Sequence, residues 1–240
     1  MRTITQAPEP RSFLEWKRGQ QRDAPQNFSY ANLPTHVNTD IKKALLKGQG
    51  HLCAYTQRRI TAPSDCHIEH VVPQNQAQHL ALDYCNMLAC FPSNGGDTSH
   101  GYGAPIKSGT HVSLGENFVS PYAAGCDVRF VFDRKGHIHS KTNDHAAQHT
   151  IDCLHLNHAQ LVELRQRALI AHGLTLRTTD LRSRRAAPRL TSKQATTLAT
   201  TVLRADAQNQ FEPFCNAISQ VSAAYAKREL ARSARMKNRP

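Results

Sequence analysis

The feature of this sequence that most restricts its fold is a short run of reactive polar side chains that a proline ends. Residues 66–73 read Cys-His-Ile-Glu-His-Val-Val-Pro, so three groups able to bind a metal or transfer a proton lie within four residues. If this run is extended, His67 and Glu69 project to one side and His70 projects to the other. A metal on one side and a general base on the other can flank a single phosphate, so the run predicts a short strand that carries a reactive site.

The length and composition of the chain fit a globular protein of one or two domains. Its 240 residues carry a net charge of +12, and 39% of them are apolar. No stretch approaches the ~20 apolar residues of a membrane span, and the first residues have no apolar signal-peptide core. Its seven cysteines are an odd number in a chain too long to depend on disulfides. We therefore expect a soluble cytoplasmic protein without membrane contact, whose thiols are free or bind metal.

The positive charge is concentrated in the last third of the chain. The first 150 residues have a net charge of +3, whereas the last 90 have +9. The basic residues are densest at 177–189 and 227–239. A basic face favours a polyanion, most simply nucleic acid, through phosphate contacts and counterion release. A solvated helix surface with a basic tail, or a docking site for an acidic partner, is the alternative interpretation.

Periodicity and turn residues indicate short helices and short strands in a mixed, α+β order. Helical spacing, caps and stop signals predict helices over residues 12–20, 40–47, 83–91, 156–172, 192–207 and 214–236. The β-like runs are 51–55 and 66–72, and a hairpin is predicted from 127–133 and 137–140. For the helix over 40–47, the expected cap is Asn38 or Thr39 and the expected stop is Gly48.

Two metalloenzyme patterns are tested first against the run at 66–73. The zinc-protease patterns H-E-x-x-H and H-x-x-E-H fail, because the spacing between the two histidines is one residue too short. A zinc-dependent nucleobase deaminase would use His67 and Glu69 but needs P-C-x-x-C downstream. Here Cys85 and Cys90 are separated by four residues and follow no proline. The deaminase is therefore the weaker alternative.

The third pattern is that of the ββα-metal, or HNH, nuclease. It has an acidic residue or His followed by His at the end of a strand, then Asn after a loop, and then a metal-binding His or Asn from a short helix. The chain offers Glu69-His70, then Asn86 sixteen residues later, and then Asn94 after a further eight. Both intervals fit a compact ββα unit.

The sequence around this pattern resembles a particular nuclease family. Its segments His-Leu-Cys-Ala-Tyr-Thr (51–56), His-Ile-Glu-His-Val-Val-Pro (67–73) and Asp-Tyr-Cys-Asn-Met-Leu-Ala-Cys (83–90) are similar to the LCAYC, HIEHxxP and NLxxxC series of the PtuB-like HNH endonucleases. These are the nuclease subunits of Septu and related retron anti-phage systems. The flanks at 10–16 and 151–157 are similar as well, so the resemblance spans residues 8–170.

The resemblance implies an α+β fold in which a ββα-metal (HNH) core is embedded in a mostly helical protein. Residues 1–50 would form an N-terminal arm and helix, and residues 51–112 would form the nuclease core. Residues 113–175 would supply a hairpin and a helix that complete the domain. Residues 176–240 would form a basic helical extension that the resemblance does not cover.

The resemblance also implies roles for individual residues. His70 would be the general base, because an imidazole with a pKa of about 6.5 accepts a proton from water at neutral pH. Asn86 would orient that ring through its side-chain carbonyl. Glu69 would bind Mg²⁺ or Mn²⁺ as a hard oxygen ligand, and Asn94 is the best match to the last ligand. The other implied residues are Asp97 and His100 as replacements for Asn94, His67 as a less favoured ligand, and Lys107 as a phosphate contact.

A structural zinc is a separate question. Many HNH proteins clamp the ββα unit with zinc on two C-x-x-C pairs. Here the pairs that begin at Cys53 and Cys90 each have Thr or Ser in place of the second thiol. A zinc site would need Cys66 or Cys85 to complete it. The favoured interpretation is that Cys53 and Cys90 are small buried residues.

The function implied is metal-dependent hydrolysis of phosphodiester bonds in DNA or RNA by the effector of an anti-phage defence system. The implied partners are nucleic acid, a PtuA-type ATPase, and a retron reverse transcriptase with its nucleic-acid product. Two other classes stay open: a non-catalytic nucleic-acid-binding module that keeps the ββα shape, and the zinc deaminase.

Overall fold

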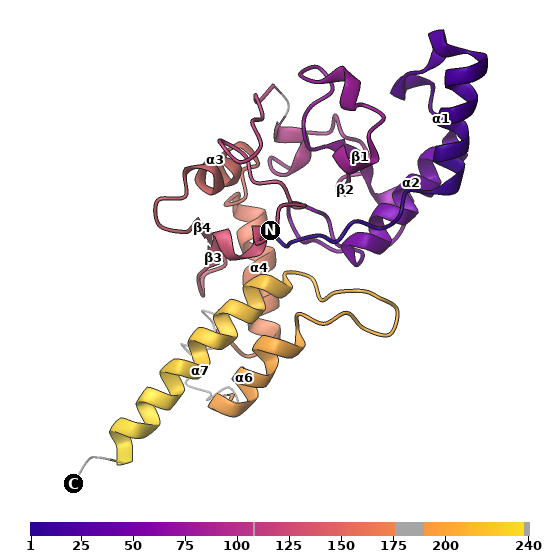
Figure 1. Ribbon diagram of the computed structural model, residues 1–240. Helices are drawn as coiled ribbons and strands as arrows, with labels where there is room; N and C mark the ends of the chain where they lie inside the picture. The colour runs from indigo at the N-terminus through magenta and orange to yellow at the C-terminus, as the bar shows by residue number, and fades with distance from the viewer. Residues whose placement is uncertain (108, 176–189, 238–240) are drawn as a thin grey trace.

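The computed structural model describes residues 1–107, 109–175 and 190–237, with side chains described up to residue 235. The Arg-rich run at 177–189 therefore lies outside the described residues. Figure 1 shows α1 and α2 at one end, β1–β2 beside them, and α7 at the other end. The helices and strands, which together make an α+β protein, are α1 (Arg11–Asp23), α2 (Thr35–Gln49), β1 (His67–His70), β2 (Met87–Cys90), β3 (Phe130–Phe132), β4 (Ile138–Ser140), α3 (His145–Cys153), α4 (Ala159–Ala171), α6 (Ser192–Thr201) and α7 (Cys215–Lys237).

Both sheets have two antiparallel strands. The pairing of β3 with β4 confirms the predicted hairpin, and Gly136 in its turn has a positive φ of 86°. The β1 strand pairs with β2 in a register that places His67 opposite Cys90 and His70 opposite Met87. The predicted helix over 83–91 was therefore wrong. Residues 87–90, all of them apolar and buried, form a strand, because a short apolar run without periodicity fits either a helix or a strand until its pairing partner decides.

Two further expectations were wrong. The β-like run at 51–55 does not form a strand: His51 and Gln57 have positive φ, and only one bridge, from Leu52 to Arg59, forms there. No α-helix lies between β2 and α3 in the described residues, where the 3₁₀ turns at Ala104–Lys107 and Cys126–Arg129 are the helical elements. The structure thus shows a two-stranded unit without the helix that a ββα core requires.

The α2 helix is longer at both ends than the predicted helix. It begins at Thr35 after a proline and ends at Gln49, followed by Gly50 with a φ of +61°, so the expected cap and the expected stop at Gly48 both lie inside it. Gly48 has a packing role instead. A Cβ at Gly48 would lie 3.0 Å from the backbone nitrogen of Ala7, so the N-terminal segment passes against the helix where a side chain is missing.

One hydrophobic core joins the ends of the chain. It includes Ile41 of α2, Leu88 of β2, Leu161 of α4 and Ile218 of α7. The Gln220 side chain of α7 accepts a hydrogen bond from the Phe132 backbone N–H (3.0 Å) and donates one to the Phe130 carbonyl (2.9 Å), which fixes α7 along the edge of β3. The first half of α7 therefore belongs to the same folded body as the strands. No helix among the described residues is long and apolar enough to cross a membrane.

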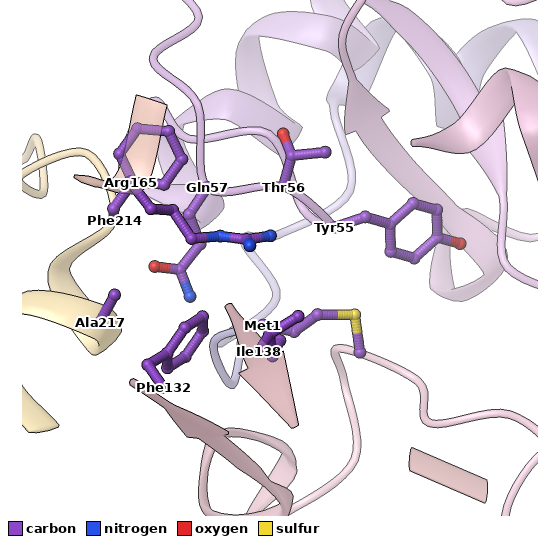
Figure 2. A pocket seen from close by; sticks show the side chains of 9 residues that line it. All are labelled: Met1, Tyr55, Thr56, Gln57, Phe132, Ile138, Arg165, Phe214 and Ala217. Atoms are coloured by element: carbon purple, nitrogen blue, oxygen red, sulfur yellow. The ribbon is translucent and has the colours of Figure 1, made fainter. Parts of the chain in front are cut away.

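Arg165 ties α4 to the preceding loop and to the hairpin. Its side chain is 2% exposed and donates hydrogen bonds to the carbonyls of Gly136 (2.9 Å) and Leu156 (2.6 Å). Burial lowers the pKa of this guanidinium to about 9. Figure 2 shows it beside Gln57 at a cavity of about 10 Å³, which has room for one water molecule and not for a substrate.

Replacing this arginine should destabilise the fold. Arg165→Ala leaves two buried carbonyls without donors, so we expect the free energy of unfolding to fall by about 2–4 kcal/mol. Arg167→Ala, two residues along the same helix, removes a 69% exposed side chain and should change it by less than about 0.5 kcal/mol. Urea unfolding measures both, and equal effects would contradict the role assigned to Arg165.

Candidate active site

The β1 strand places its polar side chains as its alternation predicts. His67 and Glu69 are partly buried on one face, while His70 is 6% exposed on the other. The strand is held at its end by the Val71 backbone N–H, which donates to the Asn86 carbonyl at 2.8 Å. The loop between β1 and β2 then returns to the strand and supplies the partners of His70.

The imidazole of His70 is fixed in one tautomer. Its Nε2 lies 2.9 Å from the Ala81 carbonyl, which can only accept, so Nε2 carries the hydrogen. Its Nδ1 lies 3.1 Å from the Gln74 side-chain nitrogen and accepts a hydrogen bond from it. Burial lowers the pKa of His70 despite the opposing effect of the Ala81 carbonyl. The ring is therefore neutral at neutral pH, with its lone pair on Nδ1.

Tyr30 forms a wall beside this imidazole. Its ring centroid is 4.8 Å from that of His70, and the two rings are nearly perpendicular at 82°. Burial, together with the nearby Glu69 carboxylate, raises the pKa of Tyr30 to about 12, so the phenol stays neutral. The aromatic ring limits the access of water to one side of His70. Sequence reasoning missed Tyr30, Gln74 and the Ala81 carbonyl, because none of them belongs to the local motif.

Asn86 clamps the loop and does not contact the imidazole. Its side-chain oxygen accepts from the Val72 N–H at 2.8 Å, and its side-chain nitrogen donates to the carbonyls of Val72 (3.0 Å) and Leu80 (3.3 Å). The expectation that its amide oxygen bonds the His70 ring was wrong, because the Ala81 carbonyl takes that place. Since Leu80 precedes Ala81, the Asn86 amide positions the carbonyl that fixes the His70 tautomer.

Removing this clamp should affect both the stability of the fold and the hydrogen exchange of the loop. Asn86→Ala leaves three backbone groups of the loop without their side-chain partner, so we expect the free energy of unfolding to fall by about 2–3 kcal/mol. The Val72 amide should also lose protection from hydrogen exchange. Asn75→Ala, an exposed site in the same loop, is the control and should change neither quantity. Unaltered exchange at Val72 in the Asn86 variant would contradict the clamp.

Lys107 is buried against the end of β1. Its side chain is 3% exposed and forms an ion pair with Glu69 Oε1. The same ammonium donates to the carbonyls of His70 (2.6 Å) and Val71 (3.0 Å) and lies 3.4 Å from the Tyr55 hydroxyl. Its donors are thus engaged by protein groups, where the resemblance implied a phosphate contact. Lys107 therefore positions the Glu69 carboxylate and the end of β1.

Glu69 and His67 face each other across a gap. The His67 Nδ1–H donates to the Pro92 carbonyl at 2.5 Å, so in the neutral form of the ring the lone pair lies on Nε2. That Nε2 is buried, lies 3.7 Å from Glu69 Oε2, and has no hydrogen-bond partner among the described residues. Burial alone would raise the pKa of Glu69, but His67 and Lys107 lower it overall, so the carboxylate is ionised. For His67, burial lowers the pKa but Glu69 and the Pro92 carbonyl raise it overall.

This pair fits a divalent cation. Histidine ligands of metals commonly donate their other ring N–H to a carbonyl, as His67 does to Pro92. The buried Nε2, which has no hydrogen-bond partner among the described residues, is the atom of His67 that could bind a metal beside Glu69. One imidazole and one carboxylate suit Mn²⁺ at least as well as Mg²⁺, which prefers oxygen ligands. Within the described part of the chain, no three His, Cys, Asp or Glu side chains gather to hold a metal, so water and substrate oxygens would complete the coordination.

Each of the other expected ligands has a local partner of its own. The segment that carries Asn94 lies beside His67, since a Cβ at Gly95 would be 2.9 Å from the His67 ring. The Asn94 side chain itself accepts a hydrogen bond from the Gly96 N–H. The remaining two have local partners: Asp97 accepts from the Ser99 N–H, and the His100 ring packs 4.7 Å from that of Phe91.

Two of the cysteines meet near the site. Cys53 and Cys90 are fully buried and share a hydrogen bond, and the Phe91 N–H donates to the Cys53 sulfur at 3.4 Å. Burial would raise the pKa of Cys53, but these hydrogen bonds lower it to about 5, while burial and the neighbouring thiol raise that of Cys90. Cys85 is exposed, and Cys66 lies 3.5 Å from the Pro63 carbonyl. Neither joins the pair in the described structure.

Comparison with known proteins adds no relative. No protein-family model matches the chain, and no curated protein matches it. The chemistry of the site must therefore be argued from its own geometry: a neutral imidazole on one face of β1 and a carboxylate–imidazole pair on the other.

Proposed function

We propose that the chain is a metal-dependent endonuclease of the HNH type that hydrolyses phosphodiester bonds of nucleic acid. The observation that carries this proposal is the His70 imidazole, which is neutral, has its Nε2–H fixed by the Ala81 carbonyl, and carries its lone pair on Nδ1. It adjoins Glu69, which lies on the other face of the same strand. The residues that the resemblance compares with the HNH pattern lie on β1, immediately before β2 and, for Asn94, after β2.

In this proposal the general base lies on one face of β1 and the metal-binding pair lies on the other. His70 Nδ1 takes a proton from a water molecule that replaces the Gln74 side chain, and the Ala81 carbonyl stabilises the imidazolium through Nε2–H. The water oxygen bonds to phosphorus as the bond between phosphorus and the 3′-oxygen breaks. Glu69 and His67 would hold Mn²⁺ or Mg²⁺, which when bound polarises the phosphate and stabilises the leaving 3′-oxygen. Lys107 keeps the Glu69 carboxylate in place.

The biological setting is proposed on the sequence resemblance. We propose that the nuclease is the effector of an anti-phage defence system that acts with a PtuA-type ATPase. A retron reverse transcriptase and its nucleic-acid product are proposed as further partners. The ion and the base act on the phosphate and not on the nucleobase, so both DNA and RNA are candidate substrates.

A substrate panel tests the proposal. Plasmid DNA, single-stranded DNA and total tRNA are incubated with the purified chain and Mn²⁺ or Mg²⁺, alone and with the ATPase. Cleavage that EDTA abolishes is expected in at least one substrate. No cleavage under any of these conditions would favour the non-catalytic binding module. One tightly held zinc per chain would favour the deaminase, although Cys85 is exposed and Cys90 is paired with Cys53.

A further inference from the structure

The α7 helix extends beyond the body that it packs against. Its last hydrogen bonds with the segment around α6, among the described residues, are those from Tyr225 to the Leu190 carbonyl (3.3 Å) and from Ser192 to the Ala226 carbonyl (3.1 Å). After Ala226, every described side chain is exposed except that of Glu229. Figure 1 shows this part of α7 projecting away from α6 and from the β1–β2 sheet.

The projecting part of α7 is strongly basic on one side. Arg228, Arg232 and Arg235 follow the i, i+4, i+7 spacing that places side chains on one helix face. Their positions rise along the axis by about 6 Å and then about 4.5 Å. Lys227 adds a fourth positive charge, and Glu229, which lies 3.9 Å from Arg232, is the one acidic residue in this part.

The β3–β4 turn brings further positive charge to the same place. Arg134 and Lys135 are exposed in this turn, which follows β3, the strand that the Gln220 hydrogen bonds hold against α7. Burial lowers the pKa of Arg228, and the positive charge of the nearby Arg134 lowers it further. Neither turn residue forms an ion pair with any residue that the structure describes. Like charges gathered in this way are stabilised by an anionic ligand.

We propose that this basic arm binds the phosphate backbone of nucleic acid at a site apart from the active site; the arm consists of Arg134, Lys135, Lys227, Arg228, Arg232 and Arg235. The choice of nucleic acid as the ligand rests on the proposed function. Guanidinium groups bind phosphate oxygens in pairs, which suits a row of arginines. Among the residues between them, Ala231, Ser233 and Ala234 are small, and the exposed Leu230 (60%) lies two residues from both Arg228 and Arg232, on the opposite face of the helix. The arginine face therefore offers no large apolar anchor of the kind found at the centre of protein interfaces. This favours a polyphosphate over an acidic protein.

Binding by the full chain in EDTA isolates the arm from catalysis. The arm variant is R228Q/R232Q/R235Q, and the matched control is R11Q/R22Q/K43Q. The control removes the same charge from α1 and α2, where the three side chains are 91%, 79% and 63% exposed. The probes are a fluorescent DNA duplex, an RNA duplex of the same sequence, and polyglutamate.

At low salt the arm variant should bind both duplexes at least tenfold more weakly, and the control should change their Kd less than twofold. The slope of log K against log salt should fall by about 2–3 for the arm variant, since three phosphate contacts are lost. Equal losses in both variants, no loss in the arm variant, or polyglutamate binding as tight as duplex binding would overturn the inference. Arm-dependent binding without metal-dependent cleavage would leave the arm standing and reject the nuclease.

Discussion

His70→Ala is expected to slow nucleic-acid cleavage by about 10²–10⁴-fold, the range typical of a lost general base. The reason is geometric: in the described structure, the His70 imidazole is the neutral base at the end of β1 whose tautomer a backbone carbonyl fixes. The alanine variant keeps Glu69, His67 and Lys107, so it should still bind Mn²⁺. Single-turnover rates at saturating substrate separate the lost proton transfer from weaker binding.

His79→Ala is the matched control for this variant. His79 is an exposed histidine of the same loop, so its loss removes one imidazole without touching the site. We expect its rate to stay within twofold of the wild-type rate. Cleavage by the His70 variant at the rate of the His79 variant would remove His70 from the mechanism.

The second large effect is expected at the metal pair. Glu69→Gln keeps the shape of the side chain but removes the carboxylate that faces His67 Nε2 at 3.7 Å. Partners that only orient a metal ligand are worth 10–100-fold in affinity, so the loss of the ligand itself should weaken Mn²⁺ binding by at least about 100-fold. Titration of Mn²⁺ followed by electron paramagnetic resonance measures this without substrate.

Two further variants keep this prediction testable. Glu69→Gln also leaves the buried Lys107 ammonium without its carboxylate, which is destabilising. His67→Gln leaves that ion pair intact and should still weaken Mn²⁺ binding, more than it weakens Mg²⁺ binding. Asp97→Asn removes a carboxylate whose hydrogen-bond partner is the nearby Ser99 N–H and should leave Mn²⁺ binding unchanged. Unchanged Mn²⁺ binding in both site variants would reject the pair as a metal site.

Part of the local structure could be predicted from the sequence. The alternation in residues 67–70 correctly placed two side chains on one face and one on the other, because strand geometry follows directly from the pattern. The hairpin and α4 were also predicted, since their turn residues and helical spacing are local signals. Residues 87–90 were assigned to a helix because a four-residue apolar run carries no period, and only its pairing with β1 defines it as a strand.

The parts that were missed depend on contacts between distant residues or on the backbone. The Ala81 carbonyl that fixes His70 belongs to the main chain, so no side-chain motif marks it. Tyr30 reaches His70 from a different segment, and the buried position of Lys107 follows from the packing around Tyr55 and the end of β1. Sequence spacing cannot report such contacts, because they depend on how separate segments pack together.

Identifying the chemical groups at the ends of the cleaved fragments tests the central claim most directly. Attack by a His70-activated water on phosphorus, with departure of the 3′-oxygen, predicts fragments with 5′-phosphate and 3′-hydroxyl ends. These ends should form only with a divalent cation and an intact His70. Fragments with 3′-phosphate or cyclic phosphate ends, or cleavage that continues in EDTA, would contradict the account.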